Sequence, residues 1–446
     1  MGLAKTSALG MGMPGLGLAM LPGHPDVQSG DELERNVMQV TIDHIIARLT
    51  HSDTLEQAVA EPEPRAVVFE GSLDEVNQYF YENLWTDGLP IVPPTRERVL
   101  AFLAFTERAP DQTLGTLLPE KRTATVWSVA VNGVMAGCRP EYMPILLALV
   151  DAMADPEYGV EHSGNTPGAE TQIVINGPII KDLSFNFEQG ALRDGFQANT
   201  SIGRFWRLYL SNVVGFQRHQ NDKATFGGTW RVVMAENHDA LADLGWSGLC
   251  TDLGLPPGEN GVFVSRFTGG KVVASVYGAT ADECLPYLAD ALVGISTWEL
   301  IFTVGMTVGK YKPLLVLSPI VAKVLARSGL GKADVQARLF ELARIPAVRF
   351  EQYMGAYTNL VPGRRKLSDL AMLGKAPKAF GAGRDPSRLV PIVVRPEDIL
   401  IAVSGDPLRT NCYVMAHNGF LGFPTVKPIE LPTRWRALLR DGSDHA

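Results

Sequence analysis

The chain has 446 residues, of which 46% are hydrophobic and 20% are charged, as in globular proteins with roughly two or three domains. The formal net charge of −8 provides no basic surface, so no nucleic-acid partner is expected. The four cysteines lie far apart and form no C-x-x-C pair, which argues against a disulfide framework or a structural zinc site. We therefore expect a protein of the reducing cytoplasm.

Two apolar stretches resemble membrane or export segments only at first sight. Residues 8–22 follow Lys5, but their glycines and prolines would break the helix of a signal peptide. The later run over residues 286–308 contains Asp290 and Glu299, which a membrane-spanning helix would avoid. We expect neither a signal peptide nor a membrane span.

The first part of the chain reads as a short unit followed by a linker. Residues 1–25 are expected to form a strand with loops, and residues 30–49 a helix. The charged, proline-containing stretch at residues 53–65 is typical of a linker. A larger unit then begins, with a strand over residues 66–70 and a capped helix over residues 72–85.

A proline-rich loop follows at residues 85–95, WTDGLPIVPPT. Its prolines and glycine predict a rigid irregular backbone, and Thr95 is placed to cap a helix over residues 96–105. Rigid loops often carry function, so Asp87 is a candidate substrate-binding residue. The alternative is a purely structural loop.

The sequence Gly137-Cys138-Arg139-Pro140-Glu141 separates two apolar helices, expected at residues 126–137 and 144–153. Proline is accepted at the first position of a helix, so Cys138 should lie just outside a helix N-terminus. The helix dipole and the neighbouring Arg139 would favour the thiolate, the nucleophilic form of cysteine. The alternative is a small buried residue in a corner between helices.

Polar residues follow the apolar segments further along the chain. The turn-rich loop at residues 164–168 contains Asn165 and Thr166 and leads into a strand over residues 171–176 that ends at Asn176. Positions just beyond buried strands often carry site residues in α/β domains, so these three side chains are candidates for substrate binding.

A helix is expected within residues 197–215, capped by Asn199, Thr200 or Ser201. Arg204 and Arg207 lie three residues apart on one face, where their guanidinium groups could hold a carboxylate or a phosphate. The alternative is ordinary surface ion pairing. Asn212 is a further polar candidate on this helix.

A strand over residues 230–237 ends in Glu236-Asn237-His238, a pair of groups suited to acid and base roles or simply to the start of the next helix. The remaining elements are expected as paired strands, crossover helices and short apolar strands, at residues 261–267, 271–277, 280–294, 314–317, 320–328, 332–343, 390–394 and 398–403. This alternation predicts an α/β fold with mixed, largely parallel sheets, crossover helices and more than one lobe. We expect a main domain at residues 66–310 and a C-terminal lobe at residues 311–446.

Two longer segments, Asp87–Thr95 and Asn132–Pro144, resemble a bacterial family related to the UGSC-motif (seleno)proteins. In those proteins a selenocysteine or cysteine occupies the first motif position. Further matches lie at Gly164–Pro178 and Ala198–Gly215. Residues 1–52 resemble the closing segment of a UGSC-type domain, without the part that carries the redox motif. The resemblance implies a subunit that docks against a separately encoded UGSC-type partner, or a relic of a fusion.

Together these features predict a small-molecule enzyme, a thiol-dependent lyase, hydrolase or oxidoreductase, that forms a homo- or hetero-oligomer. Cys138 would be the nucleophile or redox residue, Arg139 would lower its pKa, and Glu236 would be the general base. The expected substrate-binding residues are Asp87, Asn132, Asn165, Thr166, Asn176, Arg204, Arg207 and Asn212. Nucleotide-binding motifs are absent from the sequence, and no cofactor is assigned.

Two alternatives remain open. One is a non-catalytic partner or scaffold subunit in which Cys138 is simply buried. The other is a metal-dependent lyase that uses His162, Glu170 or His238, although the spacing of these residues does not match a known metal motif, and no metal ligands are assigned.

Overall fold

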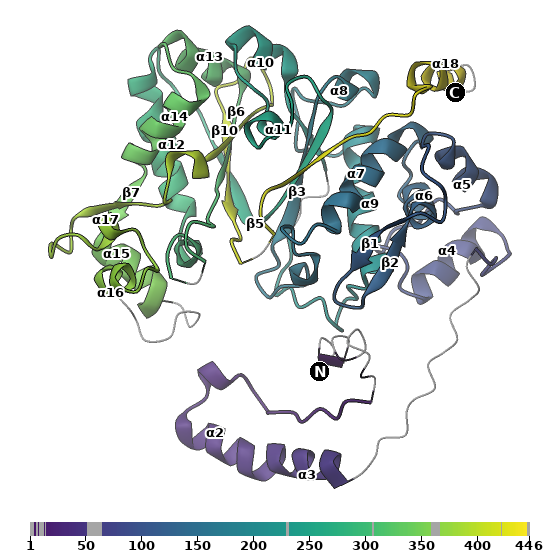
Figure 1. Cartoon of the computed structure of the whole chain (residues 1–446), viewed down its shortest axis with the longest axis horizontal. Coiled ribbons are helices and arrows are strands. Elements are labelled where there is room, and N and C mark those ends of the chain that lie inside the picture. The colour runs from purple at the N-terminus through teal and green to yellow at the C-terminus, as the bar shows by residue number, and fades with distance from the viewer. Residues whose placement is uncertain are drawn as a thin grey trace.

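The computed structural model of the chain describes residues 4, 5, 8, 13, 15–50, 65–228, 232–305, 307–357, 366–420 and 422–443. Within this part, a central mixed sheet is flanked by helices, which confirms the α/β class (Figure 1). None of the described helices combines the length and the apolar composition that a membrane crossing requires.

The sheet has seven strands, and its pairing is mixed rather than largely parallel. The order along the sheet is β4 (Met234–Ala235), β3 (Glu170–Asn176), β5 (Gly261–Val273), β10 (Cys412–His417), β6 (Leu314–Leu317) and β9 (Leu400–Val403), with β11 (Thr425–Pro428) also paired to β5. Only β3 with β4 and β6 with β9 are parallel, whereas the other four pairings are antiparallel.

The expected hairpin at residues 261–277 is wrong, because one continuous strand, β5, runs from Gly261 to Val273. Gly269 and Gly270 stay within the ladder and pair with Ala416 and Met415 of β10. Two adjacent glycines usually indicate a turn, but here a strand far along the chain supplies the hydrogen-bond partners. Non-local pairing therefore decides the conformation at this point.

The described residues form three hydrophobic cores, two of which are built largely from the longer helices. The first contains α5 (Arg96–Leu103), α6 (Val126–Met135), α7 (Met143–Met153) and α9 (Gln197–Tyr209). The second contains α12 (Ala281–Ile295), α13 (Pro319–Arg327) and α14 (Lys332–Leu342). These helices confirm the expected positions. Strands from both sides of residue 310 share the one sheet, so the proposed domain boundary stays a prediction.

The C-terminal segment returns to the first core. After β11 the chain runs along α7, and α18 (Trp435–Ser443) places its first residue there (Figure 1). Trp435 is buried, with its ring centroid 6.2 Å from that of Phe105, and its indole N–H donates to Asp182 at 3.2 Å. The last described helix therefore completes a core built mainly by the first half of the chain.

The N-terminal helix is confirmed, running through α2 (Gly30–Asn36), a π-helical turn (Val37–Thr41) and α3 (Ile42–Thr50). None of its residues is buried. Most of residues 1–14 and of the expected linker at 53–65 lies outside the described residues. The strand expected at residues 66–70 is not formed, whereas the capping box of Ser72 and Glu75 opens α4 (Leu73–Glu82) as expected.

Shorter elements complete the described part of the chain. A small hairpin joins β1 (Thr113–Leu117) with β2 (Arg122–Thr125), and a second pair joins β7 (Arg344–Pro346) with β8 (Leu389–Pro391). The strand expected at residues 390–394 therefore belongs outside the main sheet. The remaining short helices are α8 (Ile179–Asp182), α10 (His238–Leu244), α11 (Leu249–Asp252), α15 (Ala347–Glu351), α16 (Leu367–Met372) and α17 (Lys378–Gly381).

Gly133 of α6 allows the close approach of three helices, which yields a first prediction. A Cβ atom at this position would lie 2.7 Å from both Leu146 Cδ1 of α7 and Phe102 Cε1 of α5. Because the Phe102 ring is buried and rigid, Gly133→Ala should lower the free energy of unfolding by about 1–3 kcal/mol. Chemical denaturation measures this change.

Gly294, near the end of α12, provides the matched control. It is exposed, and an added Cβ would meet only the flexible end of Lys271 at 3.3 Å. Gly294→Ala should be neutral or should stabilise the protein by up to about 1 kcal/mol. Equal stability of the two variants would contradict the role assigned to Gly133.

Candidate functional site

Helix α9 brings together the four segments that were singled out in the sequence. It begins at Gln197, with Phe196 at the N-cap position, and continues through a π-helical turn to Gly215, whose φ of 95° ends it. The expected cap at residues 199–201 is wrong, because these side chains bond elsewhere. The Asn199 amide donates to Val233 O at 2.8 Å, and the Ser201 hydroxyl donates to Gln197 O at 2.7 Å.

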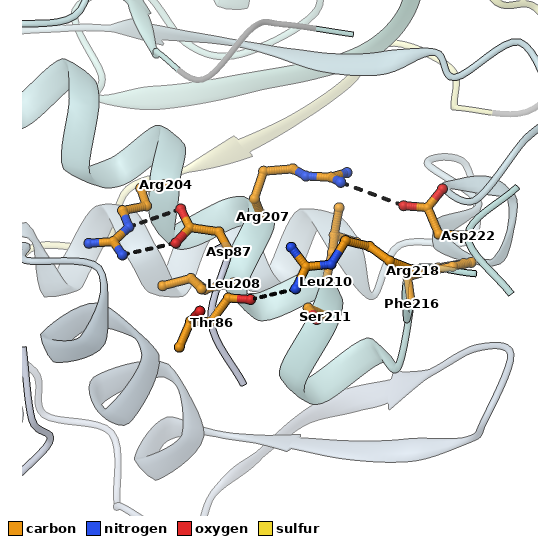
Figure 2. Close-up of a pocket in the computed structure, with 10 residues that line it drawn as sticks. All are labelled: Thr86, Asp87, Arg204, Arg207, Leu208, Leu210, Ser211, Phe216, Arg218 and Asp222. Carbon is orange, nitrogen blue, oxygen red and sulfur yellow. Dashed lines mark hydrogen bonds and ion pairs between the residues drawn. The ribbon is translucent and has the colours of Figure 1, made fainter. Parts of the chain in front are cut away.

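Arg204 fastens the proline-rich loop to α9. Its Nε and Nη2 donate to the two carboxylate oxygens of Asp87 at 3.0 and 2.9 Å (Figure 2). Nη2 also donates to the carbonyl oxygens of Leu89 and Pro90. Burial acts to raise the pKa of Asp87, but the hydrogen bonds and charge of Arg204 outweigh it, so this pKa lies below its ordinary value. The Nε and Nη2 side of the guanidinium is thus engaged by the loop.

Arg207 points toward the next two segments. Its guanidinium lies 3.1 Å from Glu170 Oε1, at the start of β3. It also lies 3.6 Å from Asp222 Oδ2, in the loop after α9 (Figure 2). About a third of its side chain is exposed. Both arginines of the predicted pair therefore have carboxylate partners, but the Arg207 side chain is more exposed than the Arg204 side chain.

Asn132, which is buried, and the partly buried Asn212 form an amide pair between α6 and the end of α9. The Asn212 amide donates to Asn132 Oδ1 at 3.0 Å and to Trp85 O at 3.2 Å. Asn132 in turn donates to Ser128 O within α6. Neither residue lines the pocket described below, so the pair positions the helix and the loop.

A pocket of about 130 Å³ opens beside α9, and residues of several segments line it (Figure 2). The lining residues are Thr86, Asp87, Arg204, Arg207, Leu208, Leu210, Ser211, Phe216, Arg218 and Asp222. Three guanidinium groups and two carboxylates thus face a wall that is partly apolar.

The sequence interpretation missed Arg218, Asp222, Thr86 and Ser211. Arg218 donates to the carbonyl oxygen of Thr86 at 3.3 Å, and it has no ion pair with any carboxylate in the described part of the chain. It lies in a turn just after Gly215, where no periodicity marks it. The available signal was the concentration of charged residues directly after a helix-ending glycine.

Cys138 lies behind this pocket rather than in its lining. Gly137 takes a left-handed conformation with φ of 77° at the end of α6, and the Cys138 N–H donates back to Gly133 O at 3.1 Å. The side chain of Ser201 and the charge of Arg204 are close enough to influence the pKa of the thiol. The expected break between the two apolar helices is confirmed at this point. Pro140 takes the first position of a short 3-10 turn that precedes α7.

The expectation of a thiolate with a low pKa is wrong in this structure. Burial raises the pKa of Cys138 to about 12, although the hydrogen bond from Ser201 and the charge of Arg204 act in the opposite direction. Arg139 does not offset the burial, because it pairs with Glu141 and lies over the Tyr142 ring, 5.4 Å from its centroid. The thiol is therefore neutral at physiological pH.

Glu236 and Asn176 belong to a separate polar cluster where the ends of the sheet meet. The fully buried Glu236 carboxylate accepts from Asn176 Nδ2 at 2.5 Å, Leu249 N at 2.7 Å and Val403 N at 3.0 Å. Because these donors fasten the carboxylate to β3, α11 and β9, it acts as a structural tie. No hydrogen bond among the described residues joins it to Cys138.

His238 completes this cluster as a neutral acceptor. Its Nε2 accepts from Gly177 N at 2.9 Å, and burial holds its pKa below the ordinary value. The curled sheet brings its two edge strands, β4 and β9, close together. Asn237 N, just after β4, donates to Val403 O of β9 at 2.8 Å and joins the two edges. Within the residues that the structure describes, no three His, Cys, Asp or Glu side chains are grouped to hold a metal ion.

Asn165 and Thr166 stabilise their own loop. The Asn165 amide donates to His162 O at 3.0 Å, and its oxygen accepts from Ala169 N at 2.9 Å. The Thr166 carbonyl accepts from both the amide and the hydroxyl of Thr225. These contacts place Glu170 beside Arg207 and pack the loop against the segment that carries Asp222.

A second prediction concerns the thiols. Burial raises the pKa of each of the four cysteines, so the folded protein at pH 7.5 should leave Cys138 unmodified by iodoacetamide. Mass spectrometry should find all four thiols alkylated only after denaturation. Rapid alkylation of Cys138 alone in the folded protein would show that the thiol becomes accessible and ionised in solution.

A third prediction concerns the ion pair of Asp87. Asp87→Asn leaves the largely buried Arg204 without its charged partner and should cost about 3 kcal/mol of stability in chemical denaturation. The low pKa of Asp87 means that this contribution is complete above the ordinary value of 3.8 and is lost as the pH falls through the folded-state pKa. The difference between wild type and variant should therefore narrow in strong acid.

The exposed pair of Arg395 and Glu397 serves as the control for that experiment. Both side chains are about 60% exposed and lie 3.4 Å apart. Glu397→Gln should change the stability by no more than about 0.5 kcal/mol. A loss of stability as small as this in Asp87→Asn would show that the ion pair between Arg204 and Asp87 contributes little to the free energy of unfolding.

Comparisons of the chain with protein-family models, with curated proteins and with solved structures find no match. The resemblance to the UGSC-related family therefore stays a prediction, and function is inferred from the geometry of the pocket.

Proposed function

We propose that the protein is a small-molecule enzyme that binds an organic substrate with an anionic group in the pocket beside α9. The observation that supports this most directly is Arg218. Its guanidinium faces the pocket, and within the described residues it bonds to a carbonyl oxygen rather than to a carboxylate. Guanidinium groups pair preferentially with carboxylate and phosphate groups, so an anion is the natural partner.

The size and lining of the pocket limit the ligand further. A volume of about 130 Å³ is well below the 300–1,000 Å³ typical of sites for drug-sized molecules. Leu208, Leu210 and Phe216 provide apolar contact opposite the charged groups. These features favour a molecule of a few heavy atoms with one charged end and one apolar end, and they disfavour a nucleotide.

A thiol-dependent reaction is the second candidate. Burial raises the pKa of Cys138, but Ser201 and the charge of Arg204 act in the opposite direction, and Arg204 lines the pocket. A lyase, hydrolase or oxidoreductase with Cys138 as nucleophile or redox residue would require a movement that admits the substrate to the buried thiol. The proposal for the pocket does not depend on this step.

An association with another subunit, including a UGSC-type partner, and a cytoplasmic location also remain proposals. The N-terminal helix supports an association, because Ile45, Ile46 and Leu49 of α3 are exposed. A scaffold subunit without catalysis would use the same helix. Ligand binding by the pocket therefore separates the enzyme from the scaffold.

A fourth prediction tests the pocket. Short-chain carboxylates and inorganic phosphate should be titrated into the protein by isothermal calorimetry, and at least one should bind. Arg218→Gln should weaken this binding about 10-fold or more, because a hydrogen-bonded charge contributes about 1.4 kcal/mol or more. Thermal unfolding of the variant checks that the fold is retained.

Arg338→Gln is the matched control, since it removes a surface guanidinium that pairs with Asp282. It should leave the binding of the anion unchanged. Failure of every anion to bind the wild type would overturn the proposal. Equal binding by wild type and Arg218→Gln would assign the anion to a different site.

A further inference from the structure

Asp222 reaches into the pocket from the loop after α9, where a ligand carboxylate would have to bind. Its Oδ2 atom lies 3.6 Å from Arg207 Nη2, opposite the guanidinium (Figure 2). The other carboxylates around the pocket lie closer to their arginines, at 2.9 Å for Asp87 and 3.1 Å for Glu170. The contact of Asp222 is therefore too long for a hydrogen bond and is the weakest of the three.

The loop that carries Asp222 also carries Arg218. Its turn is closed by three backbone amides, of residues 220, 221 and 222, that donate to the Gln217 carbonyl at 3.1–3.2 Å. The buried Asn221 anchors the turn, because its side chain donates to Gly215 O at 2.9 Å and accepts from Gln217 N at 2.7 Å. One structured turn thus presents a cation and an anion to the same pocket.

The charges of the pocket balance in a specific way. Asp87 neutralises Arg204, and Glu170 is the nearer partner of Arg207. Asp222 then supplies the one further negative charge, close to Arg207, in a pocket that Arg218 also lines. A ligand with a single carboxylate could replace Asp222 and leave the number of positive and negative charges around the pocket equal. A ligand of higher charge would leave an excess of negative charge.

Resting on the function proposed above, we infer that Asp222 is an internal competitor that occupies Arg207 until a small monocarboxylate displaces it. The incoming carboxylate lies between Arg207 and Arg218, and its short apolar body contacts Leu208, Leu210 and Phe216. Asp222 rotates away from Arg207 and is hydrated. The substrate class is thus a short-chain monocarboxylate, and Asp222 sets how tightly it binds.

The test compares the binding of butyrate, by isothermal calorimetry, to wild type and to Asp222→Asn. The asparagine has nearly the same shape but no charge, so it should compete less for Arg207. Butyrate should bind the variant about 3- to 10-fold more tightly. Butyramide, which has the shape of butyrate without its charge, should bind neither protein.

Asp239→Asn is the matched control for the change in net charge. Asp239 pairs with Lys181 on the surface, away from the residues that line the pocket. This variant should bind butyrate as the wild type does. An equal gain in Asp239→Asn would assign the effect to general electrostatic attraction and overturn the inference.

The remaining outcomes separate the two proposals. If wild type binds butyrate and Arg218→Gln weakens that binding, but Asp222→Asn does not improve it, the pocket is correct and the role of Asp222 is wrong. If neither wild type nor Asp222→Asn binds butyrate, the inference is overturned. If the wild type binds no carboxylate or phosphate at all, both the inference on Asp222 and the proposed function are overturned.

Discussion

Arg204 holds the carboxylate of Asp87 and the carbonyl oxygens of Leu89 and Pro90 at the same time. A planar guanidinium satisfies several acceptors only when they converge in one plane, so this contact fixes the loop relative to α9. The position of Thr86, which accepts from Arg218, follows from it, and so does the shape of the pocket wall. Loss of this one ion pair would therefore alter the pocket and not only its charge.

The two polar clusters of the protein are built on different principles. Around Glu236 every donor comes from the protein itself, and the carboxylate is fully buried. Such an arrangement rigidifies a structure but leaves no bonding capacity for a ligand. Around Arg207 and Arg218 the contacts are longer and partly exposed, and bonding capacity remains. This difference, rather than the type of residue, separates a structural tie from a candidate binding site.

Local features were predictable from the sequence, whereas non-local ones were not. The caps at Ser72 and Thr95 and the apolar helix α7 follow from short-range rules, and the structure confirms them. The segments that converge on α9 were identified, but their convergence could not be derived from spacing. Asp87 and Arg204 are far apart in the chain, and neither residue type specifies its partner.

The errors have the same physical origin. The continuous strand β5 depends on a ladder with β10, which no local pattern at Gly269 and Gly270 reveals. The pKa of Cys138 depends on its burial, and no local pattern of residues reveals how deeply a helix corner is buried. Arg218 and Asp222 acquire their importance only from the pocket that the folded chain creates.

The return of Trp435 to the first core has a consequence for the order of assembly during synthesis. Phe105 and its neighbours leave the ribosome long before the side chain of Trp435, which covers them, is made. The ladder between β5 and β10 likewise joins segments that are synthesised at very different times. The nascent chain therefore exposes part of its apolar interior until β10 and Trp435 have been synthesised, a period in which a chaperone that binds apolar segments would protect it.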